Sequence, residues 1–308
     1  MSTSIMVTGG CGFIGTHLVR ELRRRGHNVW TSDIRQSGDP KHVRCDVAHT
    51  RQLERALTAA KFDFVYNLAA EYGRWNGEDY YENLWNTNVV GTKNVLNLQR
   101  RQRFRLIQFS SAEVYGDYDG VITEDVMERI PIKQLNDYAM TKWVNEMQVL
   151  NAASMFGTES VRVRPVNAYG PGEHYSPYRG VIPVFIHKAL HDEPYTVYKN
   201  HRRIFDYVED TCETLANIAD KFRPGEVYNL GAKEEVDIKH VSDLILGFLG
   251  KDDSKVTYKE AEPFTTRVKR IDSSKAAAHL GHKPKTPFEQ GLRRTIEWMK
   301  TVDSTRDE

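Results

Sequence analysis

The 308-residue sequence predicts an α/β fold, in which helices cover both faces of a doubly wound parallel sheet. Two observations predict it. Short apolar runs alternate with segments of helical periodicity through the first half of the chain, as in a parallel sheet buried on both faces. A glycine-rich turn joins the first apolar run to the first helical one. The same alternation fixes the order of the elements.

The expected strands are Ser4–Thr8, Asn28–Ser32, Val43–Cys45, Phe64–Leu68, Leu106–Phe109 and Ser160–Val166. The expected helices are Phe13–Arg25, Thr50–Ala60, Asn86–Gln102 and Tyr138–Phe156. After Asn167 the pattern loosens, and glycine, proline and aromatic residues concentrate in Tyr169–Gly180. We therefore expect a first domain over 1–167 and a smaller mixed α/β C-terminal lobe over 168–308, part of which returns to the first domain.

Composition excludes several classes of function. The net charge of +1 creates no field that would gather nucleic acid or an anionic membrane. The three cysteines have no paired spacing, which favours a reducing, cytoplasmic location. We expect no metal site, because the eleven histidines are scattered and no HExxH-type pair occurs. No secretion signal and no membrane span are expected.

Residues 8–15 read Thr-Gly-Gly-Cys-Gly-Phe-Ile-Gly, and this run predicts dinucleotide binding. Gly10, Gly12 and Gly15 satisfy the spacing GxGxxG, and Gly9, Gly12 and Gly15 satisfy the alternative GxxGxxG. Phe13 and Ile14 begin the helix that follows. Such a turn brings backbone close to a pyrophosphate and aims helix N–H groups at it. Because the run follows the first strand, we expect a Rossmann-type nucleotide site.

Asp33, at the end of the second strand, predicts NAD rather than NADP. Its carboxylate can accept hydrogen bonds from the adenosine ribose and would repel a 2′-phosphate. Arg35, which follows Asp33 and Ile34, could instead serve that phosphate, so NADP stays as the less favoured alternative. Asp46 and Val47, after the third strand, are expected beside the adenine.

Tyr138 and Lys142 predict a catalytic pair, since residues four apart share one face of a helix. The ammonium should lower the pKa of the phenol, which can then take a hydroxyl proton while hydride leaves the same carbon. Ser110 and Ser111 follow a strand upstream, and we expect Ser111 to share the substrate oxygen. One of the two serines should only cap the strand end.

Taken together, these segments resemble the extended short-chain dehydrogenase/reductases, in particular the NAD-dependent nucleotide-sugar epimerase/dehydratase group. The resemblance is carried by Thr8–Gly15, Asn67–Ala70, Asn88–Thr92, Ser110–Gly116, Tyr138–Lys142, Arg164–Gly172, Arg203–Asp210, Asp272–Ala276 and Leu280-Gly281. It implies that Ser111, Tyr138 and Lys142 form the hydride-transfer site. It also implies that Leu68, Ala69 and Ala70 line the cofactor and that Tyr138 and Lys142 contact it. Asn88 is expected both to support the active-site helix and to contribute to the cofactor site. Asn67 stands where this group more often has histidine.

The resemblance further implies a nucleotide-diphosphate sugar as substrate and a homodimer built on helices Asn86–Gln102 and Tyr138–Phe156. The expected substrate residues are Asn167, Arg203 and Arg267, with Arg179 a further candidate, because a guanidinium suits phosphate. Glu71–Tyr81 lies beyond a strand's carboxyl end, where ligands bind. Glu71 and Trp75 of that segment are therefore expected at the substrate as well.

The first reaction step implied is oxidation of the sugar at C4, and Glu113 bears on the chemistry of the second step. Glu113 is two residues from Ser111, so both side chains face one way on extended backbone. The sequence favours an NAD-dependent epimerase, with Glu113 as a possible second acid or base. Dehydratase and uronate decarboxylase chemistry stay open, although Ala112 lacks the acid group expected of a hexose dehydratase. A non-catalytic NAD(P) sensor is the remaining alternative.

Overall fold

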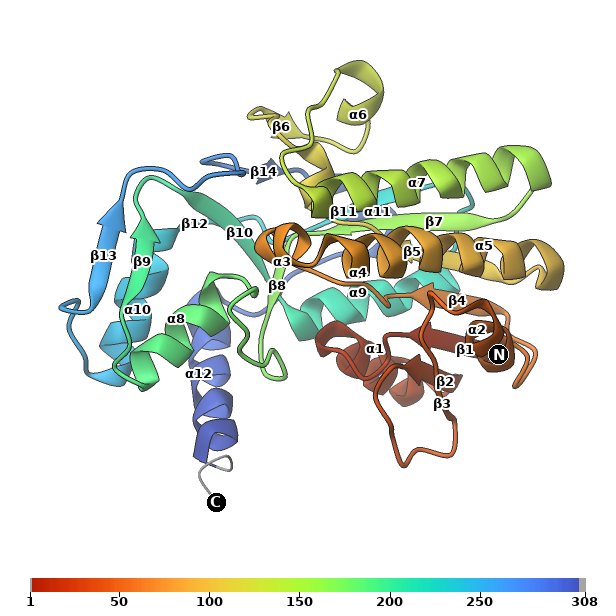
Figure 1. Cartoon of the computed structure of the whole chain (residues 1–308), viewed down its shortest axis with the longest axis horizontal. Coiled ribbons are helices and arrows are strands. Elements are labelled where there is room, and N and C mark those ends of the chain that lie inside the picture. The colour runs from red at the N-terminus through yellow and green to blue at the C-terminus, as the bar shows by residue number, and fades with distance from the viewer. Residues whose placement is uncertain (1, 305–308) are drawn as a thin grey trace.

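The central feature of the computed structural model, which describes residues 2–304, is a seven-stranded parallel sheet with the strand order β11-β7-β5-β4-β1-β2-β3 (Figure 1). Its strands are β1 (Ser4–Thr8), β2 (Asn28–Asp33), β3 (His42–Arg44), β4 (Phe64–Asn67), β5 (Arg105–Phe109), β7 (Ser160–Pro165) and β11 (Val227–Leu230). All neighbours in this sheet pair parallel. The predicted Rossmann-type fold is therefore confirmed.

Helices cover both faces of this sheet: α1 (Phe13–Arg24), α9 (Val208–Asp220) and α11 (Ser274–Leu280) lie on one face, and α2 (Thr50–Leu57), α5 (Gly91–Gln102) and α7 (Asp137–Phe156) on the other. The connections contain the shorter helices α3 (Arg74–Asp79), α4 (Tyr81–Trp85), η1 (Asn86–Val90), η2 (Ala112–Tyr115) and α6 (Val126–Arg129). In β1, Ile5 and Val7 pack against α1 and α9 on one face, whereas Met6 packs against α2, α5 and α7 on the other. Successive residues of this strand thus pack alternately into two separate cores.

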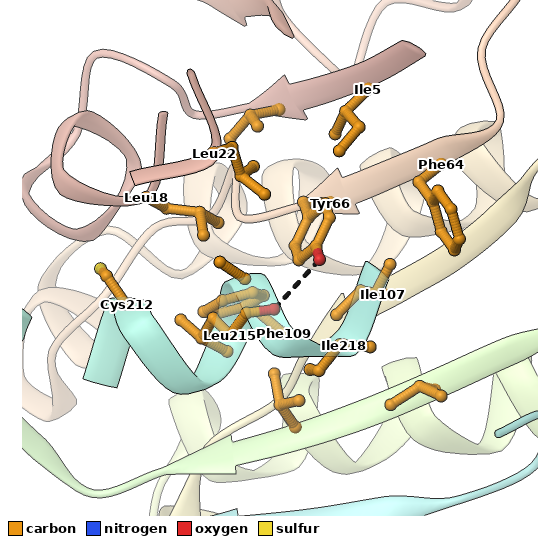
Figure 2. Close-up of a cluster of buried hydrophobic side chains, with 14 of the residues drawn as sticks. Ile5, Leu18, Leu22, Phe64, Tyr66, Ile107, Phe109, Cys212, Leu215 and Ile218 are labelled. Atoms are coloured by element: carbon orange, nitrogen blue, oxygen red, sulfur yellow. Dashed lines mark hydrogen bonds between the residues drawn. The ribbon is translucent and has the colours of Figure 1, made fainter. Parts of the chain in front are cut away.

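The first of these cores is shown in Figure 2. Leu18 and Leu22 of α1 meet Tyr66 of β4 and Leu215 of α9. The fully buried Tyr66 hydroxyl donates to the Leu215 carbonyl at 3.0 Å, which satisfies the polar tip of the ring. Since α9 and β11 come from beyond residue 167, the second half of the chain completes the sheet of the first.

A smaller mixed lobe carries the remaining elements. Its sheets are β8 (Asn167–Tyr169) with β10 (Arg202–Tyr207) and β12 (Glu235–Asp237), β9 (Tyr195–Tyr198) with β13 (Val256–Lys259), and β6 (Val121–Ile122) with β14 (Arg270–Ile271). Its helices are α8 (Val181–Leu190), α10 (Ile238–Leu249) and α12 (Phe288–Ser304). They enclose a separate apolar cluster that includes Ile186, Val241 and Leu292.

The predicted helix Asn86–Gln102 is helical throughout, but it continues directly from α4 and its first five residues form the π-helical turn η1, in which Asn88 is buried. The segment Glu71–Tyr81 contains the short helix α3, which was not predicted. The other predicted elements of the first half shift by three residues or fewer at their ends. Within residues 2–304, no helix combines the length and apolar character needed to cross a bilayer.

A buried ion pair joins the elements that carry the site. Glu146 of α7 is fully buried and accepts hydrogen bonds from Arg164 Nε at 2.8 Å and Arg164 Nη2 at 2.7 Å. Arg162 Nη1 donates to the same carboxylate at 3.2 Å, and so does the Ser110 hydroxyl. One side chain therefore connects helix α7 to β7 and to the end of β5.

Replacing Glu146 should be severely destabilising. Glu146→Ala leaves two buried arginines without their anion, so we expect the free energy of unfolding to fall by about 3–5 kcal/mol. Glu54→Ala is the control, because it removes an exposed ion pair with Arg101 and should cost under about 1 kcal/mol. Urea unfolding measures both, and a Glu146→Ala loss as small as that of the control would contradict this account.

Candidate functional site

A cleft of about 1000 Å³ lies along the carboxyl ends of the central strands. Its walls include the predicted cofactor residues Gly9, Gly12, Phe13, Ile14, Gly15, Asp33, Ile34, Arg35, Asp46, Val47, Leu68, Ala69, Ala70, Tyr138 and Lys142. Asn88 is the exception among the predicted residues. This is the position at which a Rossmann-type sheet binds a dinucleotide.

The glycine turn has the close packing that such a site needs. Gly9 has a φ of +67°, and a Cβ there would lie 2.8 Å from the Ala69 nitrogen. A Cβ on Gly15 would overlap the carbonyl oxygen of Gly9, which is why α1 can approach the turn only with glycine. Gly12 caps α1 without a side-chain acceptor, so the first N–H groups of the helix remain suited to a phosphate.

Asp33 supports the turn and restrains Arg35. Its Oδ2 accepts the Cys11 N–H at 3.0 Å, and its Oδ1 accepts the Arg35 N–H at 3.1 Å. Arg35 Nε also pairs with Oδ1 at 3.3 Å. The arginine is thus held by the carboxylate that repels a 2′-phosphate, an arrangement that fits NAD.

Tyr138 lies where the cleft meets a second cavity of about 410 Å³, and it lines both. Ser111 and Glu113 line the second cavity, and the Ser111 side chain acts to lower the pKa of Tyr138. Ser111 also accepts the Glu113 N–H at 3.1 Å. Ser110 instead binds Glu146, so its role is structural, although its partner is a buried carboxylate rather than the strand end.

The expected effect of Lys142 on Tyr138 is not found in this structure. Burial raises the pKa of Tyr138 to about 12, and Glu113 adds to this, whereas Ser111 and Arg179 oppose it. Lys142 Nζ lies 5.8 Å from the Tyr138 ring centroid and donates to the Phe109 carbonyl at 3.2 Å. Burial in turn lowers the pKa of Lys142 to about 8. The predicted lowering of the Tyr138 pKa by the Lys142 ammonium is therefore not found in this structure, where desolvation is the largest effect on that pKa.

Asn88 braces the site from behind the cleft. Its side chain accepts the Glu71 N–H at 2.9 Å and donates to the Thr141 hydroxyl at 3.1 Å. The segment after β4 is thereby tied to α7 between Tyr138 and Lys142. Direct contact of Asn88 with a cofactor, as predicted, does not fit, because its amide is already used by protein groups.

The predicted substrate residues divide into two sets. Trp75, Asn167, Arg179 and Arg203 line the second cavity. Trp75 is 46% exposed, and its ring packs edge-on against that of Phe264, with the ring centroids 5.4 Å apart. Glu71 instead lines the dinucleotide cleft, where its carboxylate accepts from Asn76 and Asn83.

Two predicted arginines have other roles than expected. The Nη1 of Arg203 donates to the carbonyls of Arg202 and Arg267, and its Nη2 donates to Thr265 and to the Thr266 carbonyl. These bonds occupy the two terminal guanidinium nitrogens that were expected to bind phosphate. Arg203 instead holds the loop around residue 266 in place. The Arg267 side chain is exposed and outside the cavity, and this residue contributes only its carbonyl.

The cavity also contains charges that the sequence did not reveal. Lys269, a buried residue, donates to Glu113 Oε1 at 2.7 Å, and Arg74 Nη2 donates to Glu262 Oε1 at 2.7 Å. Burial alone would raise the pKa of Glu113, but Lys269 and then Arg74 outweigh it and hold that pKa at about 2. Glu113 is therefore ionised at neutral pH and held by a cation.

Comparison with known proteins agrees with this geometry. A model of the NAD-dependent epimerase/dehydratase family matches residues 5–231. The chain is 29% identical to UDP-N-acetyl-alpha-D-glucosaminuronate decarboxylase of Bacillus cytotoxicus, over 99% of this chain and 100% of the relative. It is 30% identical to dTDP-glucose 4,6-dehydratase of Xanthomonas campestris, over 96% and 93%. The crystal structure of UDP-glucose 4-epimerase from Thermus thermophilus, a complex with NAD, superposes with a TM-score of 0.84 at 25% identity, over 96% of this chain and 99% of that one.

The Glu113–Lys269 pair should give the protein a measurable pH dependence. The pKa of Glu113 is depressed from 4.5 to about 2, so the pair stabilises the fold above pH 4.5 and that stability is lost as the pH falls towards 2. Lys269→Met should cost about 1.5–3 kcal/mol of unfolding free energy at pH 7, and less at pH 4.

The control for this variant is Lys239→Met, which breaks an exposed pair with Asp243 of the same 2.7 Å length. It should cost no more than about 0.5 kcal/mol, with little change between the two pH values. Urea titrations at pH 7 and pH 4 compare the variants with the parent protein. Equal losses of unfolding free energy in Lys269→Met and Lys239→Met would show that the buried Glu113 carboxylate does not need Lys269 to stabilise it.

Proposed function

Because the chain belongs to the NAD-dependent epimerase/dehydratase family, we propose that it is a nucleotide-sugar epimerase that works through transient oxidation at C4. The observation that carries the proposal is the position of Tyr138, at the junction of the dinucleotide cleft and the second cavity. A sugar in that cavity can present its 4-hydroxyl to Tyr138 and its C4 hydrogen to the nicotinamide. Family membership also excludes the non-catalytic sensor as an account of this chain.

Tyr138 takes the proton of the 4-hydroxyl, and the surrounding residues prepare it to do so. NAD held in the dinucleotide cleft would supply the hydride acceptor and donor for C4, together with the positive charge of its oxidised nicotinamide ring. That charge, together with Ser111 and Arg179, would oppose the burial that raises the pKa of Tyr138 to about 12. Ser111 supports the substrate oxygen as its proton leaves.

The nucleotide diphosphate is assigned to Arg179 rather than to Arg203. Arg179 lines both cavities, and its guanidinium lies 3.7 Å from the centroid of the Tyr72 ring. Its buried Nε has no hydrogen-bond partner among the described residues. A diphosphate oxygen would satisfy that donor.

The state of Glu113 favours epimerisation over dehydration. A dehydratase needs a base that reaches the C5 proton, but Glu113 is held in a 2.7 Å ion pair with Lys269 and has a pKa of about 2, which makes it a weak base. Ala112 adds no acid to expel water. A 4-epimerase needs neither group, because the 4-keto sugar only has to rotate in the site so that hydride returns to the opposite face of C4.

A second candidate is decarboxylation of a nucleotide-linked uronic acid. Arg74 lines the second cavity, and its buried Nη1 has no hydrogen-bond partner within the part of the chain that the structure describes. Arg74 and Lys269 suit a sugar carboxylate at C6. After C4 oxidation this carboxylate is β to the ketone, so C6 leaves as carbon dioxide, the electron pair passes into an enolate, and C5 is then protonated. No base at C5 is required.

The free state of Cys11, Cys45 and Cys212 supports placing the enzyme in a reducing compartment such as the cytoplasm.

The reaction is tested by following product mass with a panel of UDP- and dTDP-linked hexoses and uronic acids, incubated with the enzyme and NAD. A new isomer of unchanged mass is expected. Loss of carbon dioxide from a uronate would establish the second candidate, and loss of water would contradict both. Tyr138→Phe should lower turnover by about 10²–10⁴-fold, and full activity in that variant would remove Tyr138 from the mechanism.

We also propose a homodimer that uses α7. Met140, Met147 and Leu150 are about 40% exposed on this helix, and their spacing places them on one face. Sedimentation at micromolar concentration should give twice the mass of one chain. Met147→Glu combined with Leu150→Glu should shift the protein to monomer, whereas Val121→Glu, at an exposed apolar residue elsewhere, should not. A parent protein that sediments as a monomer would contradict the proposal.

A further inference from the structure

Two histidines and an aspartate come together away from both cavities, where helices α8 and α12 pack (Figure 1). His187 lies in the last turn of α8, and His191, four residues later, is the residue that caps the C-terminal end of this helix. Asp303 comes from the last turn of α12. One ligand atom from each residue lies within 4.8 Å of the other two.

Two buried polar atoms of this cluster have no hydrogen-bond partner within residues 2–304. His187 Nδ1 and Asp303 Oδ2 are buried and have no hydrogen-bond partner among the described residues. Buried polar atoms of this kind call for an unseen partner. His191 Nδ1 lies 2.9 Å from the His187 carbonyl, an acceptor, so this nitrogen carries the proton and Nε2 keeps its lone pair.

We propose that His187, His191 and Asp303 form a binding site for a divalent transition metal of the zinc class. Two imidazole nitrogens and one carboxylate oxygen are ligands that zinc prefers, and a water would complete a tetrahedron. Zinc bonds of about 2.1 Å place tetrahedral ligand atoms about 3.4 Å apart, so the three side chains must close up. His191 is exposed and can rotate to do so.

A simple ion pair does not explain the cluster as well. A histidine that served Asp303 as a cation would donate a hydrogen bond to it, and no such bond is formed by His187 Nδ1 or Asp303 Oδ2. The neighbouring charges Lys188 and Glu193 are already paired with each other. A metal ion accounts for both unpartnered atoms at once.

The site would fix one wall of the dinucleotide cleft. The Tyr175 ring stacks on His187 with its centroid 3.6 Å away and an interplanar angle of 10°. Tyr175 lines the cleft, and so does Trp298 of α12. A metal that joins α8 to the end of α12 therefore holds both aromatic residues in place.

The proposal departs from the sequence-based expectation of no metal site. The pair His187 and His191 was visible in the sequence, but its spacing alone is common on helices. Asp303 lies far along the chain, and only the packing of α12 on α8 brings it near.

The test uses the full chain without a histidine tag, freed of metal by a chelator and titrated with Co²⁺. Binding of one equivalent should produce the intense visible absorption of tetrahedral cobalt, which Zn²⁺ should then abolish by displacement. Metal should also raise the thermal midpoint, because it binds the folded state. Absence of saturable binding, or only the weak spectrum of octahedral cobalt, would overturn the proposal.

Three variants distinguish this site from adventitious binding. His191→Ala and Asp303→Asn should each weaken Co²⁺ binding by at least about tenfold while leaving the thermal midpoint of the metal-free protein nearly unchanged. His240→Ala, at an exposed histidine of the adjacent helix α10, should bind as the parent does. Equal binding in all three variants, or equal losses, would contradict the assignment. These readouts do not depend on turnover, so they stand apart from the proposed epimerase activity.

Discussion

The arrangement of the catalytic centre depends on one buried carboxylate. Glu146 gathers Arg162 and Arg164 from β7 and Ser110 from the end of β5 onto a single turn of α7. Lys142 lies one helical turn before Glu146, and Tyr138 lies two turns before it. The ion pairs of Glu146 therefore fix the part of α7 that positions the Tyr138 phenol. A buried anion is costly to desolvate, and here two guanidinium groups and a hydroxyl compensate for that cost.

Above that support, the site is organised by electrostatics in a confined space. Desolvation raises the pKa of Tyr138 and lowers that of Lys142, so neither group is prepared for proton transfer by burial alone. In the proposed reaction, the positive charge of a bound oxidised cofactor would favour the phenolate of Tyr138. Glu113 works against the phenolate, and Lys269 limits this effect by neutralising it.

The sequence was most informative where function depends on neighbouring residues in the chain. The glycine turn, Asp33 and the pair Tyr138 and Lys142 are local patterns, and all line the cleft as expected. Arg203 and Arg267 could not be judged in the same way, because their roles depend on a loop that folds back onto β10. Lys269, Arg74 and Asp303 were missed for a related reason. Each of these residues contacts a partner that is distant in sequence, and sequence spacing does not predict such a contact.

The origin of the seventh strand has a consequence for how the chain is made. Strand β11 covers the edge of β7, and α9 covers Leu18 and Tyr66, yet both elements come after residue 207. A ribosome that has released only the first 167 residues has therefore produced an open sheet edge and an uncovered apolar face. The sheet and its core cannot be completed before most of the chain has emerged, so the growing chain exposes an open strand edge and apolar surface until α9 and β11 are in place.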